Sequence, residues 1–427
     1  MKTTINPAQE QWKSLLQRPV INQALLTGKV KAILQEVRNN GDAAVKKFTL
    51  QFDKIDLTEI RVTDAEINAA IKTVPDSLKR AIEAAATNIR RFHESQTASE
   101  NIIEVMKGIK CWRRSVAIGK VGFYIPGGTA PLFSTVLMLG IPASIAGCKE
   151  MVLCTPPSAD NAVHPAILFA AQTSGIKNIF KAGGVQAIAA MAYGTETIPA
   201  VYKIFGPGNQ YVNCAKQLIQ LDGVAIDMPA GPSEVCVLAD ESCNPAFVAA
   251  DLLSQAEHGE DSQVLLVCNS KTIGEQVLKE IEKQIKVLPR SSMAEKSLAN
   301  SNVIVMENLE KAIALINEYA PEHLIICCRE NETIANAITN AGSVFLGNYA
   351  PESAGDYASG TNHVLPTNGF AKTFSGVSVD SFVKKITFQQ LTKEGLEAIG
   401  QSVEEMAAAE GLDAHKNAIS IRLNKKG

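Results

Sequence analysis

The stretch "DLLSQAEHGEDS" at residues 251–262 places two side chains that can bind a metal at the end of an apolar, helix-like segment. Gln255 and His258 are three residues apart, and on a helix this spacing puts both on one face. A zinc protease is not supported, because H-E-x-x-H is absent and the inverted motif H-x-x-E-H would need a histidine in place of Ser254. Glutamine is an uncommon zinc ligand. The stretch is therefore either part of a metal site completed from elsewhere or the solvated end of an ordinary helix.

The stretch "APEHL" at residues 320–324 offers acid–base chemistry. A histidine can act as a general base near neutral pH, and a neighbouring carboxylate can orient it or activate a water molecule. Glu322 and His323 lie where a helical pattern ends and the apolar strand "LIICC" begins, so both can face a cleft at the mouth of that strand. A structural Glu–His pair has the same pattern, and both interpretations stay open at this point.

The stretch "APESAGDYASGTNHVLP" at residues 350–366 is rich in small residues and is typical of a loop folded around a ligand. It presents three polar side chains that could serve such a site, Glu352, Asp356 and His363. The carboxylate of Asp356 suits a metal that accepts oxygen ligands, and the imidazole of His363 suits a substrate contact.

The C-terminal stretch "AEGLDAH" carries two further polar side chains. Glu410 and His415 stand five residues apart, which is too far round for one helical face and implies a bend. The tail has little apolar surface of its own, so we expect it to dock on a partner subunit.

Three expected strand-to-helix turns are rich in glycine: "YIPGGTAPL" at 124–132, "KAGGVQAI" at 181–188 and "FGPGNQYV" at 205–212. Small residues let a backbone approach a phosphate, and the N-terminus of the following helix supplies amide donors and partial positive charge. None of the turns matches G-x-G-x-x-G, and no acid stands at a strand end where a ribose contact is expected. One such turn alone is more often a tight connection, but three in one unit predict a dinucleotide site of atypical design.

The composition excludes several classes of protein. A chain of 427 residues with 46% hydrophobic and 20% charged residues is typical of a globular enzyme of two or more domains. The net charge of -3 argues against nucleic-acid binding, for which a basic domain or stripe is expected. No signal or transit pattern opens the chain, and the longest apolar run, residues 129–147, is interrupted by proline and glycine. The nine cysteines form no C-x-x-C pair. We therefore expect a cytoplasmic protein without a membrane span, whose cysteines are reduced and packed as small hydrophobic residues.

The order of apolar segments predicts an α/β fold with two doubly wound, Rossmann-like parallel-sheet domains and small, mainly helical N- and C-terminal segments. Strand-like and helix-like segments alternate from residue 116 and again from residue 234, whereas residues 1–100 and the tail after 380 have helical patterns. The expected division is an N-terminal helical segment (1–24), a first α/β domain (25–110 and 234–370), a second α/β domain (111–233) and a C-terminal helical tail (371–427).

Several motifs together resemble one protein family. The stretches "IDMPAGPSEV" at 226–235 and "DLLSQAEHG" at 251–259 are similar to the signature of histidinol dehydrogenases. "FYIPGG", "GPGNQYV", "APEHL" and "GDYASGTNHVLPT" resemble that family's other blocks in the same order, so the resemblance runs from about residue 10 to residue 420. It implies an enzyme that contains zinc, uses NAD and oxidises L-histidinol to L-histidine through L-histidinaldehyde, at the end of histidine biosynthesis.

The resemblance also implies roles for individual residues. One zinc ion per subunit would be held by Gln255, His258, Asp356 and His415, the last supplied by the other subunit of a homodimer. The acid–base pair would be Glu322 and His323. Substrate contacts would come from the metal ligands, from His323 and from Ser233, His363 and Glu410. NAD contacts would come from Tyr124, Gln186 and Asn209. The first α/β domain would then carry most zinc and catalytic residues, and the second would carry the NAD contacts.

The residue types agree with this chemistry. The imidazole and amine of histidinol are good zinc ligands, so the metal would serve as a template for the substrate more than as a Lewis acid. In the implied reaction His323 takes the alcohol proton, Glu322 activates water to hydrate the aldehyde, and His323 deprotonates the hydrate. No cysteine nucleophile is needed, although Cys154, at a strand end, is the best candidate for one.

The alternatives are a zinc hydrolase with Glu322 as the base and a non-catalytic, zinc-stabilised oligomer that binds a nucleotide. Manganese or cobalt could occupy the same ligand set.

Overall fold

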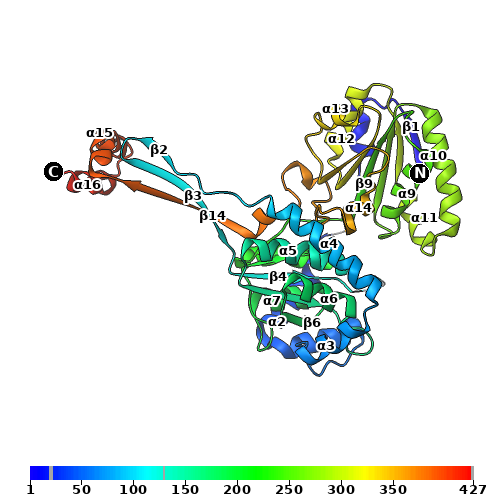
Figure 1. Ribbon diagram of the computed structural model, residues 1–427, viewed down its shortest axis with the longest axis horizontal. Coiled ribbons are helices and arrows are strands. Elements are labelled where there is room, and N and C mark those ends of the chain that lie inside the picture. The colour runs from blue at the N-terminus through cyan, green and yellow to red at the C-terminus, as the bar shows by residue number, and fades with distance from the viewer. Residues whose placement is uncertain (19–22, 128–129, 425–427) are drawn as a thin grey trace. The chain divides into compact units, whose positions relative to one another are not determined.

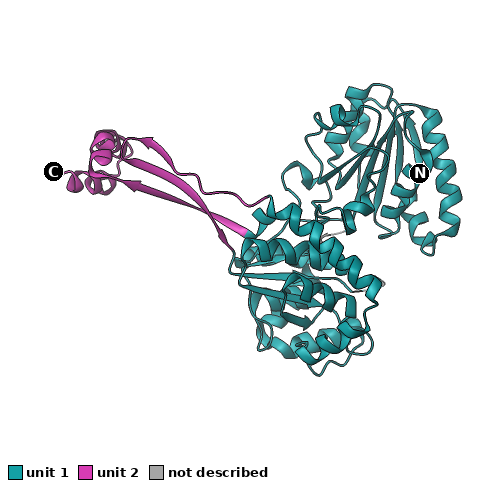
Figure 2. Cartoon of the chain, in the orientation of Figure 1, with its two compact units in different colours: residues 1–95, 118–382 teal, residues 96–117, 383–427 magenta. Residues whose placement is uncertain are grey.

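The computed structural model describes residues 1–18, 23–127 and 130–424, and the chain divides into two compact units. Unit 1 comprises residues 1–95 and 118–382, and unit 2 comprises residues 96–117 and 383–427 (Figure 2). The described residues form two parallel sheets in unit 1 and one antiparallel sheet in unit 2. The α/β fold class expected from the sequence is confirmed.

Helices cover both faces of the first sheet of unit 1 (Figure 1), and the apolar side chains of its four central strands alternate between these two buried faces. Its parallel strands lie in the order β1 (Lys2–Ile5), β11 (Asn302–Val305), β10 (Gln263–Cys268), β9 (Glu234–Ala239), β12 (His323–Cys327) and β13 (Ser343–Leu346). In β9, Val235 and Val237 face α9 (Pro245–Ala256), α10 (Lys271–Gln284) and α11 (Ser291–Ala299). Cys236 and Leu238 face α1 (Gln9–Leu15), α12 (Leu309–Tyr319) and α13 (Asn331–Ala335). The strand order reverses between β9 and β12, so a topological switch point lies there.

The second sheet of unit 1 follows the same plan with five parallel strands. They lie in the order β6 (Asn178–Lys181), β5 (Glu150–Thr155), β4 (Lys120–Tyr124), β7 (Lys203–Phe205) and β8 (Ala225–Ile226). One face packs against α3 (Asp64–Thr73), α4 (Asp76–Glu94), α5 (Phe133–Ala146) and α6 (Pro165–Ser174). The other packs against α2 (Gln23–Phe48), α7 (Gly184–Tyr193) and α8 (Gln210–Ile219). Here the strand order reverses between β4 and β7.

Short helices complete unit 1. They are the π-helical turn η1 (Thr49–Asp53), the 3-10 turns η2 (Gln220–Asp222), η3 (Ile285–Val287), η4 (Phe370–Lys372) and η5 (Val379–Phe382), and the two-turn helix α14 (Glu352–Tyr357). The segment 350–366, expected as a loop folded around a ligand, thus contains the short helix α14, and this helix carries both of its acidic candidates.

The packing of the N-terminal helices differs from the expected domain division. The sequence pattern groups residues 25–110 with 234–370, but α2, α3 and α4 pack their apolar residues against the five-stranded sheet. An amphipathic pattern states which face of a helix is buried but not which sheet buries it. The expected helical segment 1–24 contains α1 but begins with β1, an edge strand. Residues 19–22 of that segment, and residues 128–129 of the first glycine-rich turn, lie outside the described residues.

Unit 2 contains a sheet that no local pattern predicts. The antiparallel strands β14 (Val383–Leu391), β3 (Ile109–Ala117) and β2 (Ile103–Met106) lie in that order, and α15 (Lys393–Ala409) and α16 (Asp413–Arg422) complete the unit. The rings of Trp112 and Phe388 stack across β3 and β14, with centroids 5.3 Å apart. The tail is therefore helical at α15 and α16, as expected, but forms a strand at β14. The sequence pattern did not predict this strand, because its partner β3 lies far away in the sequence.

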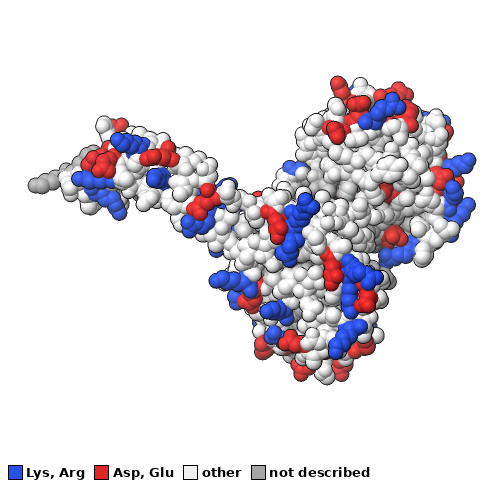
Figure 3. All heavy atoms as spheres, viewed as in Figure 1, with Lys and Arg blue, Asp and Glu red and all other residues white. Residues whose placement is uncertain are grey.

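The described residues also show whether any helix could span a membrane and whether the cysteines form disulfides. No helix among them is long and apolar enough to cross a membrane. All nine cysteines lie within the described ranges, and all are free thiols. On the face drawn in Figure 3, basic and acidic side chains are interspersed.

A buried ion pair ties α8 to the segment that follows β8. The side chains of Lys216 and Asp227 are almost fully buried, and Nζ of Lys216 lies 2.5 Å from Oδ1 of Asp227. The same Nζ donates to the carbonyl oxygen of Gly206 (2.8 Å). Asp227 accepts from the backbone N–H groups of Gly206 and Met228 (2.8 and 2.7 Å). The polar groups of this cluster satisfy one another, as a buried pair requires.

Replacing Lys216 by Met should destabilise unit 1 by about 3–5 kcal/mol, because the Asp227 carboxylate would stay buried without its cation. Urea unfolding followed by circular dichroism measures the change. The double variant Lys216→Met/Asp227→Asn should recover part of the loss, since it removes the uncompensated charge. Equal stability of the wild type and the single variant would contradict a stabilising role for the pair.

Candidate active site

A cavity of about 190 Å³ in unit 1 gathers most of the polar residues singled out by the sequence. Residues of α9, of α14 and of the strand starts at β9 and β12 line it. The candidates in its wall are Ser233, Gln255, His258, Glu322, His323, Asp356 and His363.

The end of α9 brings Gln255 and His258 to this cavity. The helix begins at an Asn244 cap, whose side chain accepts from the N–H of Ala246 (3.0 Å), and its apolar residues bury it against the six-stranded sheet. It ends at Ala256, so His258 lies in the turn that follows and donates its backbone N–H to the carbonyl oxygen of Gln255 (3.2 Å). The two side chains are therefore brought together by the end of a helix and not by one continuous helical face.

The buried side-chain amide of Gln255 has no hydrogen-bond partner among the described residues. Its side chain is 0% exposed, and neither its amide oxygen nor its amide nitrogen bonds to any described residue. A buried amide without hydrogen bonds is costly, and such groups usually meet a water, an ion or a ligand. An amide oxygen can serve as a metal ligand, so this atom fits a cation at the end of α9.

The helix α14 adds two carboxylates. Ligand atoms of His258, Glu352 and Asp356 all lie within 4.8 Å of one another, which is close enough to share a metal ion. Glu352 is 1% exposed, and its Oε2 has no hydrogen-bond partner among the described residues. The sequence places Glu352 in the right loop but holds no signal of its burial beside His323, because the contact is made across the fold.

The acid–base candidates stand at the start of β12. Oε2 of Glu322 accepts from the backbone N–H of Glu234 (2.9 Å), and Nδ1 of His323 contacts the carbonyl oxygen of Glu234 (3.2 Å). A carbonyl oxygen can only accept, so Nδ1 carries a proton, and in the neutral form of the ring the lone pair lies on Nε2. Nε2 faces Asp356 Oδ1 at 3.7 Å and bonds to no described residue. This is the arrangement a general base requires.

Burial and charge set the protonation of these groups. Burial raises the pKa of Glu322 to about 7 and the pKa of Glu352 to about 8. Burial alone would lower the pKa of His323, but the carboxylates around it, Glu352 and Glu322 foremost, raise that pKa well above its usual value. Burial opposes ionisation of Asp356 as well, yet the neighbouring imidazoles, His323 first, hold its pKa below the usual range. The cavity is rich in negative charge, so a cation would relieve carboxylate repulsion and favour neutral His323.

His363 is held in the cavity wall through both ring nitrogens. Nδ1 donates to the backbone carbonyl oxygen of Asp356 (2.8 Å), and Nε2 lies 3.0 Å from Oγ1 of Thr135 on α5. Burial lowers the pKa of His363, which keeps the ring neutral. The ring thus links the backbone at the end of α14 to α5, a contact that the sequence does not indicate.

Glu410 and His415 belong to unit 2. Glu410 caps α15, Gly411 follows with φ +71°, and His415 lies in the first turn of α16. The bend expected between them is confirmed. Both side chains are exposed within unit 2.

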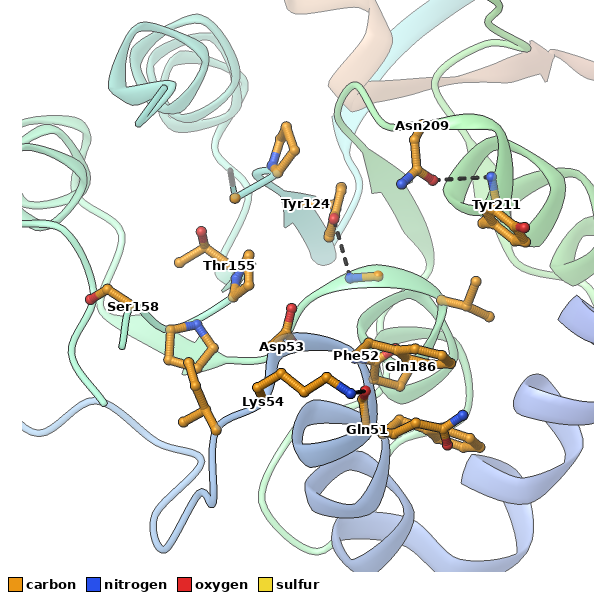
Figure 4. A pocket seen from close by; sticks show the side chains of 18 of the residues that line it. Gln51, Phe52, Asp53, Lys54, Tyr124, Thr155, Ser158, Gln186, Asn209 and Tyr211 are labelled. Atoms are coloured by element: carbon orange, nitrogen blue, oxygen red, sulfur yellow. Dashed lines mark hydrogen bonds between the residues drawn. The ribbon is translucent and has the colours of Figure 1, made fainter. Parts of the chain in front are cut away.

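A larger pocket of about 1420 Å³ contains the three candidates for nucleotide contacts (Figure 4). Tyr124 ends β4, Gln186 lies in α7, and Asn209 caps α8, so all three stand at the carboxyl edge of the five-stranded sheet beside its switch point. Gly206 has φ +125°, and a Cβ there would overlap the carbonyl oxygen of Tyr124, so this turn needs glycine. In the close-up, Asp53 lies in the same pocket, although the sequence analysis gave it no role.

The polar atoms of this pocket are arranged to meet a ligand. The phenol oxygen of Tyr124 accepts from the N–H of Gly184 (3.2 Å), and burial raises the pKa of Tyr124 to about 12, so the phenol is neutral. Asn209 Oδ1 accepts from the N–H groups of Tyr211 and Val212 (3.0 and 3.2 Å), which leaves its amide nitrogen free of the cap. The buried Oε1 of Gln186 bonds to no described residue. Together with two helix N-termini, these groups suit a phosphate-containing ligand.

The candidate cysteine nucleophile does not line the cavity that holds Gln255 and His258. Cys154 on β5 is buried in the core of the five-stranded sheet. Burial raises the pKa of its thiol far above the usual range, so the thiolate that a nucleophile requires is disfavoured.

Comparison with known proteins agrees with the geometry. The profile of the histidinol dehydrogenase family matches residues 16–423. A histidinol dehydrogenase of Bacteroides fragilis is 60% identical over 425 residues, covering 100% of this chain and 99% of that protein. One from Salmonella typhimurium is 50% identical over 418 residues, covering 97% and 95%. The crystal structure of histidinol dehydrogenase from Elizabethkingia anophelis superposes with a TM-score of 0.97 at 57% identity, covering 99% of this chain and 98% of that one. The chain therefore belongs to the histidinol dehydrogenase family and is an oxidoreductase.

Proposed function

We propose that the protein oxidises L-histidinol to L-histidine through L-histidinaldehyde, with zinc and NAD, as a homodimer in the cytoplasm. The observation that carries this proposal is the cavity in which the unpartnered amide of Gln255 meets His258, Asp356 and the unbonded Nε2 of His323. These donors form an oxygen and nitrogen set of the kind that binds zinc, with no thiolate. Family membership identifies the substrate as histidinol.

The residues of this chain take distinct parts in the proposed reaction. When bound, zinc would hold the imidazole and amine of histidinol, and NAD would accept the hydride in each oxidation. Zinc would be held by Gln255, His258 and Asp356, with a fourth ligand from His415 of the partner subunit. Ser233 and His363 line the cavity and would contact the substrate there, together with Glu410 of the partner subunit.

Proton transfer falls to the pair at the start of β12. His323 takes the alcohol proton at Nε2, the nitrogen left unprotonated by the bond between Nδ1 and Glu234. Glu322 then accepts a proton from the water that hydrates the aldehyde, and its burial makes its pKa of about 7 suitable for exchanging protons near neutral pH. His323 removes the hydrate proton for the second oxidation. NAD would be held by Tyr124, Gln186 and Asn209, which line the larger pocket.

The dimer is supported by the surface of unit 2. Its small antiparallel sheet and two helices expose a series of large apolar side chains, and exposed apolar surface of this kind often marks a protein–protein interface. They are Ile102, Ile103, Val105, Met106, Ile386, Met406, Leu412 and Ile421.

Purified protein given L-histidinol and NAD should form about two NADH per histidinol, because two hydride transfers separate the alcohol from the acid. Absorbance at 340 nm measures the product. Chelation should abolish turnover and lower the melting temperature, and zinc should restore both, since a ligand that binds only the native state stabilises it. Failure of the fully metallated protein to form NADH would refute the proposed function and favour hydrolysis with Glu322 as the base.

Replacing Cys154 by Ala should leave kcat within about twofold of the wild type, because the scheme needs no thiol and a raised pKa disfavours the thiolate. The small loss of core volume should appear as lower stability instead. Steady-state NADH formation and thermal unfolding separate the two effects. A collapse of turnover in the folded variant would refute the scheme and indicate a thiol-bound intermediate.

Two inactive variants should restore activity when combined. Glu322→Gln removes the water-activating carboxylate and His415→Ala removes the ligand expected from the tail. Co-expression of the two variants yields a mixture of homodimers and heterodimers, and each heterodimer has one wild-type cavity and one wild-type tail that meet in the same site. Randomly assorted subunits should then regain about a quarter of wild-type turnover, since half of the dimers carry one intact site of two. If each tail served its own subunit, every site would hold one defect and the mixture would stay inactive.

A further inference from the structure

Glu234, the first residue of β9, connects the candidate acid–base pair to the N-terminal segment of the chain. Its side chain is 1% exposed, and the carboxylate accepts from Nε and Nη2 of Arg18 (2.5 and 2.8 Å) and from the backbone N–H of Asn368 (2.7 Å). Bidentate contacts between a guanidinium and a carboxylate are strong and fix the orientation of both groups. The position of the Glu234 side chain is therefore set by Arg18.

The backbone of Glu234 holds both members of the pair. Its N–H donates to Oε2 of Glu322 and its carbonyl oxygen accepts from Nδ1 of His323. A rotation of this one peptide segment would release the carboxylate and would remove the contact that keeps the proton on Nδ1 of His323. The protonation state of a histidine base depends on such a contact.

Arg18 also contacts the other flank of the pair. Its Nη2 donates to the carbonyl oxygen of Tyr319 (2.7 Å), and its guanidinium lies over the Tyr319 ring, 4.2 Å from the centroid. Tyr319 ends α12, three residues before Glu322. One guanidinium thus links the end of α12 to the start of β9, the two segments between which Glu322 and His323 are held.

We propose that Arg18 and Glu234 are positioning residues for the acid–base pair, acting through the Glu234 backbone on the orientation of Glu322 and on the tautomer of His323. The proposal rests on the catalytic roles of those two residues proposed above. A pair that served folding alone would change stability without a specific effect on the chemical step. A pair that positions the catalytic groups must change kcat with the cavity still able to bind metal and substrate.

The test compares Arg18→Lys, Arg18→Met and Glu234→Gln with the wild-type holoenzyme. Lysine keeps the positive charge but cannot make the bidentate contact with the Glu234 carboxylate, so kcat should fall about tenfold in Arg18→Lys. In Arg18→Met and Glu234→Gln kcat should fall about 100-fold, because small misplacements of catalytic groups have effects of this size. KM for histidinol should stay within about twofold and zinc content should be unchanged, because neither residue touches the metal ligands. A kcat within twofold of the wild type in all three folded variants, or a rise in KM alone, overturns the proposal.

Two controls separate positioning from folding. Val277→Ala on α10 removes buried apolar volume from the core of the six-stranded sheet, and it should lower the melting temperature without changing kcat, because no residue of α10 lines the pockets described here. Arg18 lines a pocket of about 980 Å³, so guanidinium can reach the space left in Arg18→Ala. Millimolar guanidinium should restore several-fold activity to this variant, whereas equal methylammonium should not. Restoration by both cations, or by neither, counts against a guanidinium-specific orientation and overturns the proposal.

A crystal structure of zinc-loaded Arg18→Met tests, independently of turnover, whether Arg18 positions Glu322 and His323. The proposal requires the bond between Glu322 Oε2 and the N–H of Glu234, or that between His323 Nδ1 and its carbonyl oxygen, to be lost. Unchanged bonds would refute it. If wild-type protein formed no NADH from histidinol, the proposed function would fail, whereas the structure would still report whether Arg18 positions the two side chains.

Discussion

The parallel pairing of β9 with β12 brings the candidate active site together. Its register sets His323 opposite Val235 and so lays the peptide of Glu234 beside both Glu322 and His323. A single backbone segment thereby contacts both the Glu322 carboxylate and Nδ1 of His323. The strand start is in turn anchored by the buried contact between Glu234 and Arg18, so a distant N-terminal residue belongs to the support of the site.

Burial and charge oppose each other throughout the cavity. Three carboxylates lie around His323 with little access to solvent, and burial raises the pKa values of Glu322 and Glu352 to about 7 and about 8. The amide of Gln255 is buried without a partner among the described residues. Each feature costs folding free energy, and proteins depart from polar satisfaction mainly at functional sites. A bound cation would offset the negative charge and occupy the amide oxygen, so the same residues that destabilise the cavity make it selective for such a ligand.

The two sheets of unit 1 carry their pockets at opposite edges, one at the carboxyl ends of its strands and the other at the amino ends. The larger pocket lies where doubly wound sheets usually bind ligands, at the carboxyl ends of β4 and β7. The cavity that holds Gln255 and His323 lies at the amino ends of β9 and β12. A helix that follows a parallel strand returns antiparallel to it, so α9 starts at the carboxyl edge and ends at the amino edge. This is why Gln255 and His258, at the end of a helix, meet His323 at the start of a strand.

Local sequence identified Gln255, His258, Glu322 and His323 as chemically competent, because their types and spacing stand out within short stretches. It also predicted the α/β alternation and the bend after Glu410, which depend on apolar periodicity and on angles between near neighbours. It could not indicate the contact of Arg18 with Glu234, the burial of Glu352, the sheet that buries α2 to α4, or the strand β14, because each depends on contacts between residues far apart in the chain. The sequence by itself determined which side chains can do chemistry and which elements carry them. Tertiary structure alone decided their burial, their protonation and which nitrogen of His323 stays free, since these follow from the fields and hydrogen bonds of distant neighbours.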